Sequence, residues 1–331
     1  MLHIAVRRIS LVLALGLALG ACGAPATPAA PAPADPPAPP ASPTLPPLPT
    51  VEAVDGAGQT VRLAGPAQRI VSLAPSNTEL LFAVGAGAQI VGRDEFSDYP
   101  EAAKALPAIA TGMGKLNTEA VVALEPDLIL AAEITPPDQV ETLRGLGLTV
   151  FVVINPDDFE ELYGNVLSLG TLTGRGTEAQ GLADELRDRV TAVGQTLTSA
   201  TTSPRVFYEL DGTDPTKPWT SGPGTFLDLL IRAAGGTNVG AVLSSQFAQI
   251  SSEELVRQDP QVILLGDTAY GTTIEGVSAR AGWGSMTAIQ QNAVYPFDDN
   301  LVSRPGPRMV DGLEQLARLI HPELFGQQSE Y

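Results

Sequence analysis

Residue types that perform catalytic chemistry are scarce in this chain of 331 residues. It has one cysteine, Cys22, and two histidines, His3 and His321. These counts exclude disulfides, cysteine-based zinc sites, cysteine–histidine nucleophiles and multi-histidine metal sites. Asp and Glu are abundant, but no pattern pairs one with a nucleophile or a defined base. The sequence therefore predicts no enzyme, no cofactor and no metal site, and the remaining features concern binding.

Ser76 and Asn77 lie just after the strand-like run 70–73 and before an apolar helical run. Ser76 and Glu79 have the spacing of a capping box, which predicts that a helix begins there. A helix N-terminus at the carboxyl end of a strand faces the ligand crevice of an α/β sheet, and its free N–H groups suit polar or anionic groups. A helix cap without a further role fits the same residues equally well.

Two other loops carry candidate ligand contacts. Trp219 lies in the Gly- and Pro-rich run 218–225, where it offers either a stacking surface or lobe packing. Arg304 lies in a Pro- and Gly-rich loop before the last helical run and could reach a ligand carboxylate or phosphate. Arg308 begins that run and is expected on its solvated face. Trp283, between two glycines, is expected to pack in the interior.

A short internal repeat places one glutamate in each half of the chain. The runs 117–130 and 251–264 share, at a constant offset of 134 residues, a cap, a Glu, a Pro and an apolar strand. Glu119 and Glu253 fall in the first turn of the two predicted helices. There they complement the helix dipole, worth ~0.3 to 1 kcal/mol each. They could also form a matched pair of carboxylates that docks on a symmetric, cationic partner.

The elements that position these residues alternate between strand-like and helix-like runs, which predicts α/β lobes with mainly parallel sheets. The runs 51–54 and 59–63, joined by Asp55-Gly56-Ala57-Gly58, predict an edge hairpin. Helical runs are expected at 79–84, 119–124, 140–146, 226–234, 253–258 and 309–320, and strands at 70–73, 90–92, 128–131, 150–154, 206–210, 262–265 and 293–297.

A long helix is predicted between the two lobes. Apolar residues in the run 177–199 recur every three or four positions, on one face of a helix. At 1.5 Å per residue, such a helix spans ~35 Å, enough to connect two lobes. A lobe-core helix of ordinary length is the alternative. We expect a ligand cleft between the lobes, and boundaries at 51–170, 171–200 and 201–331.

The N-terminal region has the features of an exported lipoprotein. Arg7 and Arg8 precede an apolar run of about 11 residues, shorter than the ~20 needed to span a membrane, and residues 1–21 are read as a signal peptide. Leu19-Gly20-Ala21-Cys22 matches the bacterial lipobox, in which the cysteine becomes lipidated. Residues 22–50 follow as a Pro- and Ala-rich tether. The predicted location is extracytoplasmic, on the cell membrane.

Nucleic acid is excluded as a partner by charge. The formal net charge is −18, and three lysines, Lys104, Lys115 and Lys217, are present. Sequence-independent nucleic-acid binding needs a basic face, which this composition does not supply.

Three segments resemble the helical-backbone substrate-binding proteins of ABC importers for cobalamin, haem and ferric siderophores. They are Arg69 to Glu79, Val91-Gly92 with Ser97-Asp98-Tyr99-Pro100, and Asn117 to Leu130. The resemblance covers 51–325 and is nearest to the cobalamin-binding branch. It implies two α/β lobes joined by one long helix, a ligand in the cleft, and delivery to a dimeric permease with cytoplasmic ATPases.

The same resemblance implies roles for particular residues. The two docking glutamates of the family correspond to Glu119 and Glu253. Its ligand-facing aromatic positions fall near Phe96, Met113, Ala132, Trp219 and Phe247. Well-known cobalamin binders carry tryptophan where this chain has Met113, Ala132 and Phe247. Fewer aromatic rings would therefore stack on a corrin ring in this chain. Tyr208, Trp219 and Arg304 would equally suit a ferric siderophore.

The leading prediction is a monomeric, lipid-anchored binding protein that delivers a corrinoid to an ABC importer. A ferric siderophore or haem is the alternative ligand. Two other classes are a surface-anchored hydrolase, whose base would have to be His321, and a sensor or adhesion module without a small ligand. The predicted ligand-binding residues are Ser76, Asn77, Phe96, Met113, Tyr208, Trp219, Phe247 and Arg304, with Glu119 and Glu253 for permease docking and Cys22 for lipidation.

Overall fold

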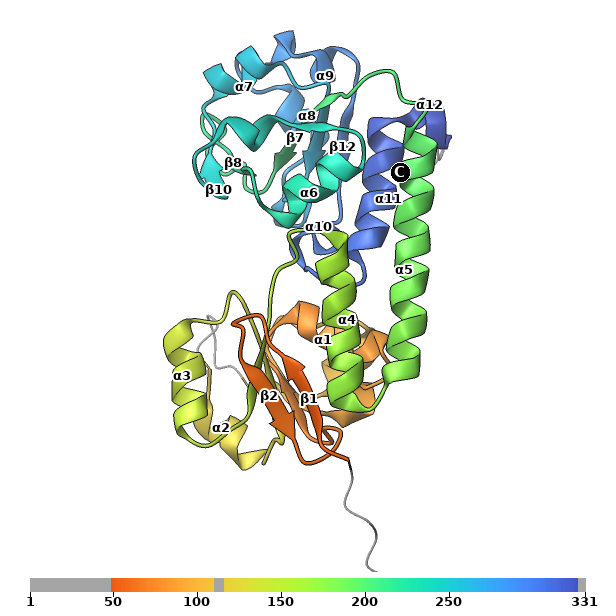
Figure 1. Ribbon diagram of the computed structural model, residues 1–331. Helices are drawn as coiled ribbons and strands as arrows, with labels where there is room; N and C mark the ends of the chain where they lie inside the picture. The colour runs from red at the N-terminus through yellow and green to blue at the C-terminus, as the bar shows by residue number, and fades with distance from the viewer. Residues whose placement is uncertain (1–48, 110–115, 327–331) are drawn as a thin grey trace, which may run out of the picture. The chain divides into compact units, whose positions relative to one another are not determined.

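The computed structural model describes residues 49–109 and 116–326. The predicted signal peptide, Cys22, most of the predicted tether and Met113 lie outside these residues. Within the described ranges, no helix is long and apolar enough to cross a membrane. The described residues form two α/β lobes, each built on a parallel sheet (Figure 1), which confirms the predicted fold class.

The N-terminal lobe is built on a four-stranded sheet of order β4-β3-β5-β6, with all neighbours parallel. A separate antiparallel hairpin, β1 with β2, confirms the predicted edge hairpin. The strands are β1 (Val51–Val54), β2 (Thr60–Leu63), β3 (Ile70–Ser72), β4 (Ile90–Arg93), β5 (Leu128–Ala132) and β6 (Val150–Val153). The helices are α1 (Pro75–Ala83), α2 (Thr118–Ala123), α3 (Pro137–Gly145) and α4 (Phe159–Thr173).

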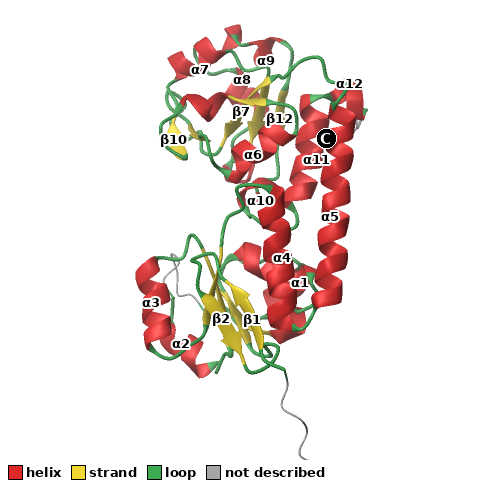
Figure 2. Cartoon of the chain, viewed as in Figure 1, coloured by secondary structure: helices red, strands yellow, loops and turns green. Residues whose placement is uncertain are grey.

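Both faces of this sheet are buried, as expected for parallel strands flanked by helices. Leu128 and Leu130 contribute to a core shared with α1 and α4, while Ile129 and Ala131 contribute to a core shared with α2 and α3. Figure 2 shows the two helical layers on opposite sides of the strands. The carboxyl ends of β3, β5 and β6 therefore lie at one edge, and the loops that follow them are available for binding.

The C-terminal lobe repeats this topology with the order β12-β11-β7-β9, again all parallel. Its strands are β7 (Arg205–Glu209), β8 (Trp219–Ser221), β9 (Thr237–Asn238), β10 (Phe247–Gln249), β11 (Val262–Leu265) and β12 (Val294–Pro296). Its helices are α6 (Phe226–Ala233), α7 (Ser252–Gln258), α8 (Ile274–Ser278), α9 (Thr287–Gln290), α10 (Asn300–Ser303), α11 (Met309–Ile320) and α12 (Pro322–Phe325).

The internal repeat corresponds to equivalent structure in the two lobes. Asn117 caps α2 by accepting from the N–H of Ala120, and Ser251 caps α7 by accepting from the N–H of Glu254. After the two helices, Glu125 and Asp259, 134 residues apart, have positive φ angles of 46° and 48°. The following strands, β5 and β11, occupy equivalent inner positions in their sheets. This confirms the predicted structural equivalence.

One helix, α5 (Gly176–Leu197), connects the lobes, as predicted. Ala179, Ala183 and Leu186 belong to the N-terminal core, whereas Val193 belongs to a core of the C-terminal lobe. Val190, between them, packs against both cores. Because the apolar face of α5 is shared in this way, bending or breaking the helix would expose side chains of both lobes.

Helix α4 (Phe159–Thr173) was not expected from the sequence. The segment contains Gly164, Gly170 and several β-branched residues, which lower helix propensity. Tertiary packing overrides this, since α4 lies along α5 (Figure 1) and supplies Leu162, Val166 and Leu169 to the N-terminal core. Asp158 caps the helix with a 2.9 Å hydrogen bond from the N–H of Glu161. That Asp-x-x-Glu spacing was the local signal for the helix.

Gly170 allows the close approach of α4 and α5. A Cβ at this position would overlap the Cβ of Ala179 on α5, whereas a Cβ on the exposed Gly164 of the same helix would meet nothing. We expect Gly170→Ala to lower the free energy of unfolding by about 1–3 kcal/mol through overpacking. Gly164→Ala should raise it by roughly 0.5 kcal/mol through helix propensity. Urea denaturation of both variants checks this, and equal effects would contradict it.

Candidate functional site

A cavity of about 590 Å³ is lined by residues of both lobes, which matches the predicted cleft. From the N-terminal lobe it is lined by residues that follow β3, β4, β5 and β6, including Ser76, Phe96, Glu133 and Asn155. From the C-terminal lobe it is lined by residues that include Leu210, Phe247, Asp299, Asn300 and Arg304. Its position at the carboxyl ends of parallel strands is the usual one for ligands of α/β folds.

Further cavities adjoin this cleft through shared lining residues. A cavity of about 230 Å³ shares Phe96 and Ile134 with it, and one of about 490 Å³ shares Glu133 and Asn155. The cleft itself lies within the usual range of ~300–1,000 Å³ for ligand sites. Together with the adjoining cavities, it has room for a ligand much larger than a single sugar or amino acid.

Four of the predicted ligand-binding residues line this cleft: Ser76, Phe96, Phe247 and Arg304. Phe96 and Phe247 come from opposite lobes, and the two residues are 59% and 48% exposed. Large aromatic side chains left open to solvent on two sides of a cleft are suited to contact the faces of a bulky, flat ligand. Ala132, which the resemblance placed at the ligand, also lines the cleft.

The other predicted residues lie differently. Asn77 is fully buried in α1 and its Nδ2 donates to the carbonyl of Leu130. Tyr208 is fully buried in β7, where its hydroxyl donates to Asp299 at 2.8 Å. Burial and the charge of Asp299 raise the pKa of Tyr208 well above its ordinary value. Tyr208 thus stays a neutral donor that orients Asp299, and Asp299 is the one of the two that reaches the cleft.

The expected loop around Trp219 contains a short strand instead. Trp219 begins β8, which pairs antiparallel with β10 and brings Gln249 opposite Trp219. Its side chain is 42% exposed and is not among those that line the cleft. Phe247, on the same β8–β10 pair, lines it. Trp283 is buried against Phe207 and under the guanidinium of Arg280, which confirms its expected packing role.

The predicted capping box at Ser76 is wrong. Helix α1 begins earlier, at Pro75, and no side chain caps it. Proline suits the first helical position because its fixed φ is already helical and it lacks an N–H that would need a partner. Ser76 and Glu79 therefore lie within the helix. This frees the carboxylate of Glu79 for a different set of partners.

Glu79 binds two arginines of the C-terminal lobe. Its side chain is 2% exposed, and it accepts from Arg308 Nε at 2.8 Å, Arg308 Nη2 at 2.6 Å and Arg304 Nη1 at 3.2 Å. Arg308 also lies over the ring of Tyr99, 4.0 Å from its centroid. The expectation that Arg308 lies on a solvated face is therefore wrong. Its guanidinium turns inward to donate to Glu79 of α1.

Arg304 has a second carboxylate partner in the N-terminal lobe. It donates to Asp98 Oδ1 at 2.6 Å. Partial burial would raise the pKa of Asp98, but the hydrogen bond and the charge of Arg304 outweigh it and hold the pKa below its ordinary value. Arg304 lines the cleft, but its guanidinium is already bound to two carboxylates. A ligand anion would have to compete with both.

Phe96 is positioned by a buried network behind the cleft. Asp94 accepts from the N–H of Phe96 at 2.8 Å and from the hydroxyl of Ser97. Ser97 in turn shares a hydrogen bond with Thr78 of α1 at 2.8 Å. Burial raises the pKa of Asp94, although the hydrogen bonds from Ser97 and Phe96 oppose it. The loop after β4 is thereby tied to α1, which holds the aromatic side chain at the edge of the cleft.

The described part of the chain offers neither a metal-binding group nor a histidine base at the cleft. Within residues 49–109 and 116–326, no group of three or more His, Cys, Asp or Glu is placed to hold a metal ion. His321 is buried after α11, with its ring nitrogens near Glu323 and the carbonyl of Gly235. It does not line the cleft and offers no base there.

Glu119 and Glu253 occupy equivalent places outside the cleft. Each is exposed in the first turn of its helix, α2 or α7. Behind each helix, an arginine at the start of an inner strand donates to two carbonyls at the helix end. Arg69, just before β3, donates to Leu124 and Glu125, and Arg205, the first residue of β7, donates to Gln258 and Asp259. The two glutamates are thus presented by similarly braced helices.

The fold and the cleft define a binding protein with two α/β lobes and one connecting helix. The sequence matches the family model described as periplasmic binding protein over residues 70–301, most of the chain. The chain therefore belongs to the periplasmic binding protein family, in the group of ABC-transporter substrate-binding proteins that includes vitamin B12-binding and haem-binding members.

Three relatives illustrate this group. A substrate-binding lipoprotein of an ABC transporter from Bacillus subtilis, YvrC, itself uncharacterised, is 30% identical over 82% of this chain and 85% of its own. The periplasmic vitamin B12-binding protein BtuF of Vibrio cholerae has 29% identity and a TM-score of 0.68, covering 79% of this chain and 99% of its own. The periplasmic haem-binding protein RhuT from Roseiflexus sp. RS-1 has 27% identity and a TM-score of 0.69, covering 77% and 98%.

Replacing Glu79 tests the contact between the lobes. We expect Glu79→Gln to lower the free energy of unfolding by roughly 3 kcal/mol, because it leaves Arg304 and Arg308 partly buried without their shared carboxylate. Glu185→Gln, on the exposed face of α5, is the matched control and should change stability by less than about 0.5 kcal/mol. Urea denaturation measures both. A loss for Glu79→Gln no larger than the control's would contradict the role assigned to this ion cluster.

Proposed function

We propose that this protein is a lipid-anchored, extracytoplasmic substrate-binding protein that captures a corrinoid and delivers it to an ABC importer. The observation that carries the proposal is the cleft between the lobes, with Phe96 on one side and Phe247 on the other. Exposed aromatic side chains on both sides suit a flat macrocycle, and the adjoining cavities leave room for its side chains. The vitamin B12-binding relative with the same fold supports this choice.

Haem and anionic ferric complexes fit the cleft less well. Haem carries two carboxylates and needs an axial ligand such as His, Tyr, Met or Cys. Among the described residues that line the cleft, Tyr270 is the one of these types, and Arg304, the one cation, is bound to Glu79 and Asp98. Glu133 and Asp299 add negative charge to the lining. The haem-binding relative keeps haem as the second candidate ligand.

The protein acts by binding, without chemical conversion of its ligand. Among the described lining residues, no Cys or His is available as a nucleophile or base, and Ser76 has no such base beside it. The surface-anchored hydrolase considered from the sequence would depend on His321, which is buried away from the cleft. The ligand itself supplies any metal centre.

The lipid anchor and the tether complete the proposal. The lipobox Leu19 to Cys22 lies outside the described residues, and its support is the sequence together with the lipoprotein name of the Bacillus subtilis relative. We propose a signal peptide at 1–21, a tether at 22–50, lobes at 51–170 and 201–331, and a linking segment at 171–200. The globular part works as a monomer that hands its ligand to a permease dimer.

Ligand titration tests the corrinoid proposal. Aquacobalamin and cobinamide should quench tryptophan fluorescence with dissociation constants at or below micromolar. Phe96→Ala and Phe247→Ala should each weaken binding about 5- to 30-fold, from about 1–2 kcal/mol of lost aromatic contact. Val54→Ala, at an exposed apolar position on β1, is the control and should bind normally. Haem bound more tightly than either corrinoid would contradict the proposal in favour of the second ligand.

Charge reversal tests the docking role of Glu119 and Glu253. The double variant Glu119→Lys/Glu253→Lys should keep the ligand affinity of the parent, since neither residue lines the cleft. It should abolish ligand uptake into cells or proteoliposomes that contain the importer, because like charges would then face the permease. Glu101→Lys/Glu275→Lys, also one exposed glutamate per lobe, should transport normally. Lost ligand affinity in the first variant would instead place its residues at the ligand.

A further inference from the structure

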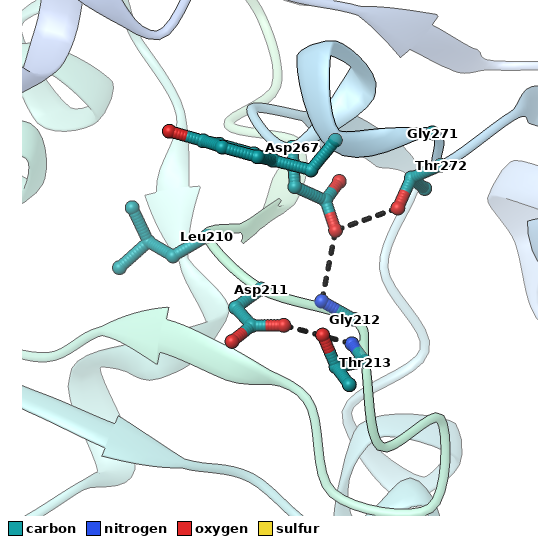
Figure 3. Close-up of a pocket in the computed structure, with 8 residues that line it drawn as sticks. Leu210, Asp211, Gly212, Thr213, Asp267, Gly271 and Thr272 are labelled. Atoms are coloured by element: carbon teal, nitrogen blue, oxygen red, sulfur yellow. Dashed lines mark hydrogen bonds between the residues drawn. The ribbon is translucent and has the colours of Figure 1, made fainter.

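A polar cavity of about 490 Å³ lies within the C-terminal lobe, beside the cleft. It is lined by Asp211, Gly212, Thr213, Asp267, Gly271 and Thr272, together with Leu210 and Tyr270 (Figure 3). Leu210 and Tyr270 also line the cleft between the lobes. A flexible arm of a ligand held in the cleft could therefore enter this side pocket past these two residues.

The side pocket is acidic. Asp211 and Asp267 line it, and its described lining contains no Lys or Arg. Burial raises the pKa of the neighbouring Glu209, Arg280 lowers it, and the charges of Asp267 and Asp211 raise it again. Arg280 does not neutralise the pocket, since both its terminal nitrogens are bound to Glu209, with Nη2 to Oε1 at 2.8 Å. The two aspartates are therefore left with negative charge to offer a ligand.

Asp267 has an oxygen without a partner. The residue is 4% exposed, and its Oδ2 accepts from the N–H of Gly212 at 2.8 Å and from the hydroxyl of Thr272 at 2.7 Å. Figure 3 shows the carboxylate among the residues that line the pocket, directed toward Gly212 and Thr272. Its Oδ1 has no hydrogen-bond partner. A buried carboxylate oxygen left unpaired costs free energy that a donor from a ligand would recover.

The backbone at Gly212 fixes the orientation of the Asp267 carboxylate. Gly212 approaches the Glu209–Arg280 pair so closely that a Cβ at this position would overlap the carboxylate of Glu209. The absence of a side chain lets the Gly212 N–H reach Oδ2 of Asp267, and this bond fixes the carboxylate. The pocket is thus lined by a rigidly held carboxylate, of which one buried oxygen has no partner.

We infer that this side pocket is a subsite for an N–H-donating, uncharged or cationic arm of the ligand, such as a primary amide, and that it disfavours ligands with a carboxylate at that place. The inference rests on the proposed function, because the arm belongs to a ligand held in the cleft. A carboxylate would meet the unpaired oxygen of Asp267 and the charge of Asp211 without a donor to offer them.

A matched pair of corrinoids tests the subsite. Cobinamide carries primary amide side chains, and cobyrinic acid carries carboxylates in their place. We expect the parent protein to bind cobinamide at least tenfold more tightly than cobyrinic acid. Asp267→Asn keeps the shape and an acceptor for Gly212 and Thr272 but places a donor at the unpaired position. The preference should fall below threefold in this variant, measured by fluorescence titration.

Two controls separate this effect from misfolding. Asp188→Asn, on the exposed face of α5, should leave the preference unchanged. Asp211→Asn, in the exposed loop after β7, should also lower the preference for cobinamide over cobyrinic acid. It tests the subsite if Asp267→Asn fails to fold. Two results would overturn the subsite alone, provided that cobinamide binds tightly. One is a preference for cobinamide over cobyrinic acid that is unaltered in both pocket variants, and the other is no such preference in the parent protein. Binding of neither corrinoid would overturn the proposed ligand class and the subsite with it.

Discussion

One buried carboxylate of the N-terminal lobe is neutralised by two arginines of the C-terminal lobe. Glu79 projects from α1, and Arg304 and Arg308 come from the segment that leads into α11. Removing Glu79 leaves the partly buried Arg308 without the carboxylate that it binds, which is far more costly than losing an exposed pair. Helix α5 imposes a matching constraint, because its apolar face belongs to the cores of both lobes. The cleft is the space that remains between lobes connected in these two ways.

This ionic contact also decides the chemistry of the cleft. From the sequence, Arg304 was expected to bind an anionic group of the ligand. In the structure it forms ion pairs with Glu79 and Asp98. The charges left toward the ligand are then those of Glu133 and Asp299, with Asp211 and Asp267 in the side pocket. An uncharged or cationic ligand rich in N–H donors suits this lining better than a polycarboxylate. The same contact therefore joins the two lobes and leaves the cleft lining acidic.

The two lobes are built alike around their exposed glutamates, but they differ in the loops that line the cleft. In both, an arginine at the start of an inner strand, β3 or β7, donates to the end of the helix that carries the exposed glutamate. The loops at the cleft are not equivalent, since the N-terminal lobe presents Phe96 from a loop braced by Asp94, whereas the C-terminal lobe presents Phe247 from the β8–β10 pair. Similar outer surfaces suit a symmetric partner, and dissimilar inner surfaces suit an asymmetric ligand.

The sequence was sufficient to predict the alternation of strands and helices, the edge hairpin, the long helix and the repeat. These depend on periodicity, turn residues and caps that lie close together in the chain. It missed α4, whose weak helix propensity is overcome by packing on α5, and it placed the start of α1 late because Pro75 was not counted as a helix opener. Trp219 was also expected in a loop, because the pairing of its strand β8 with β10, which lies far along the chain, leaves no local signal in the sequence.

Which polar groups line the cleft depends on tertiary packing. Glu79 and Arg304 are 225 residues apart, so no spacing rule could pair them. Tyr208 was expected at the ligand, yet the structure buries it and brings Asp299 to the cleft in its place. The sequence shows that Asp211 and Asp267 follow β7 and β11. That one oxygen of Asp267 lacks a partner is seen in the tertiary structure. Local chemistry specifies the elements, whereas the partner of each buried charge depends on how the elements pack.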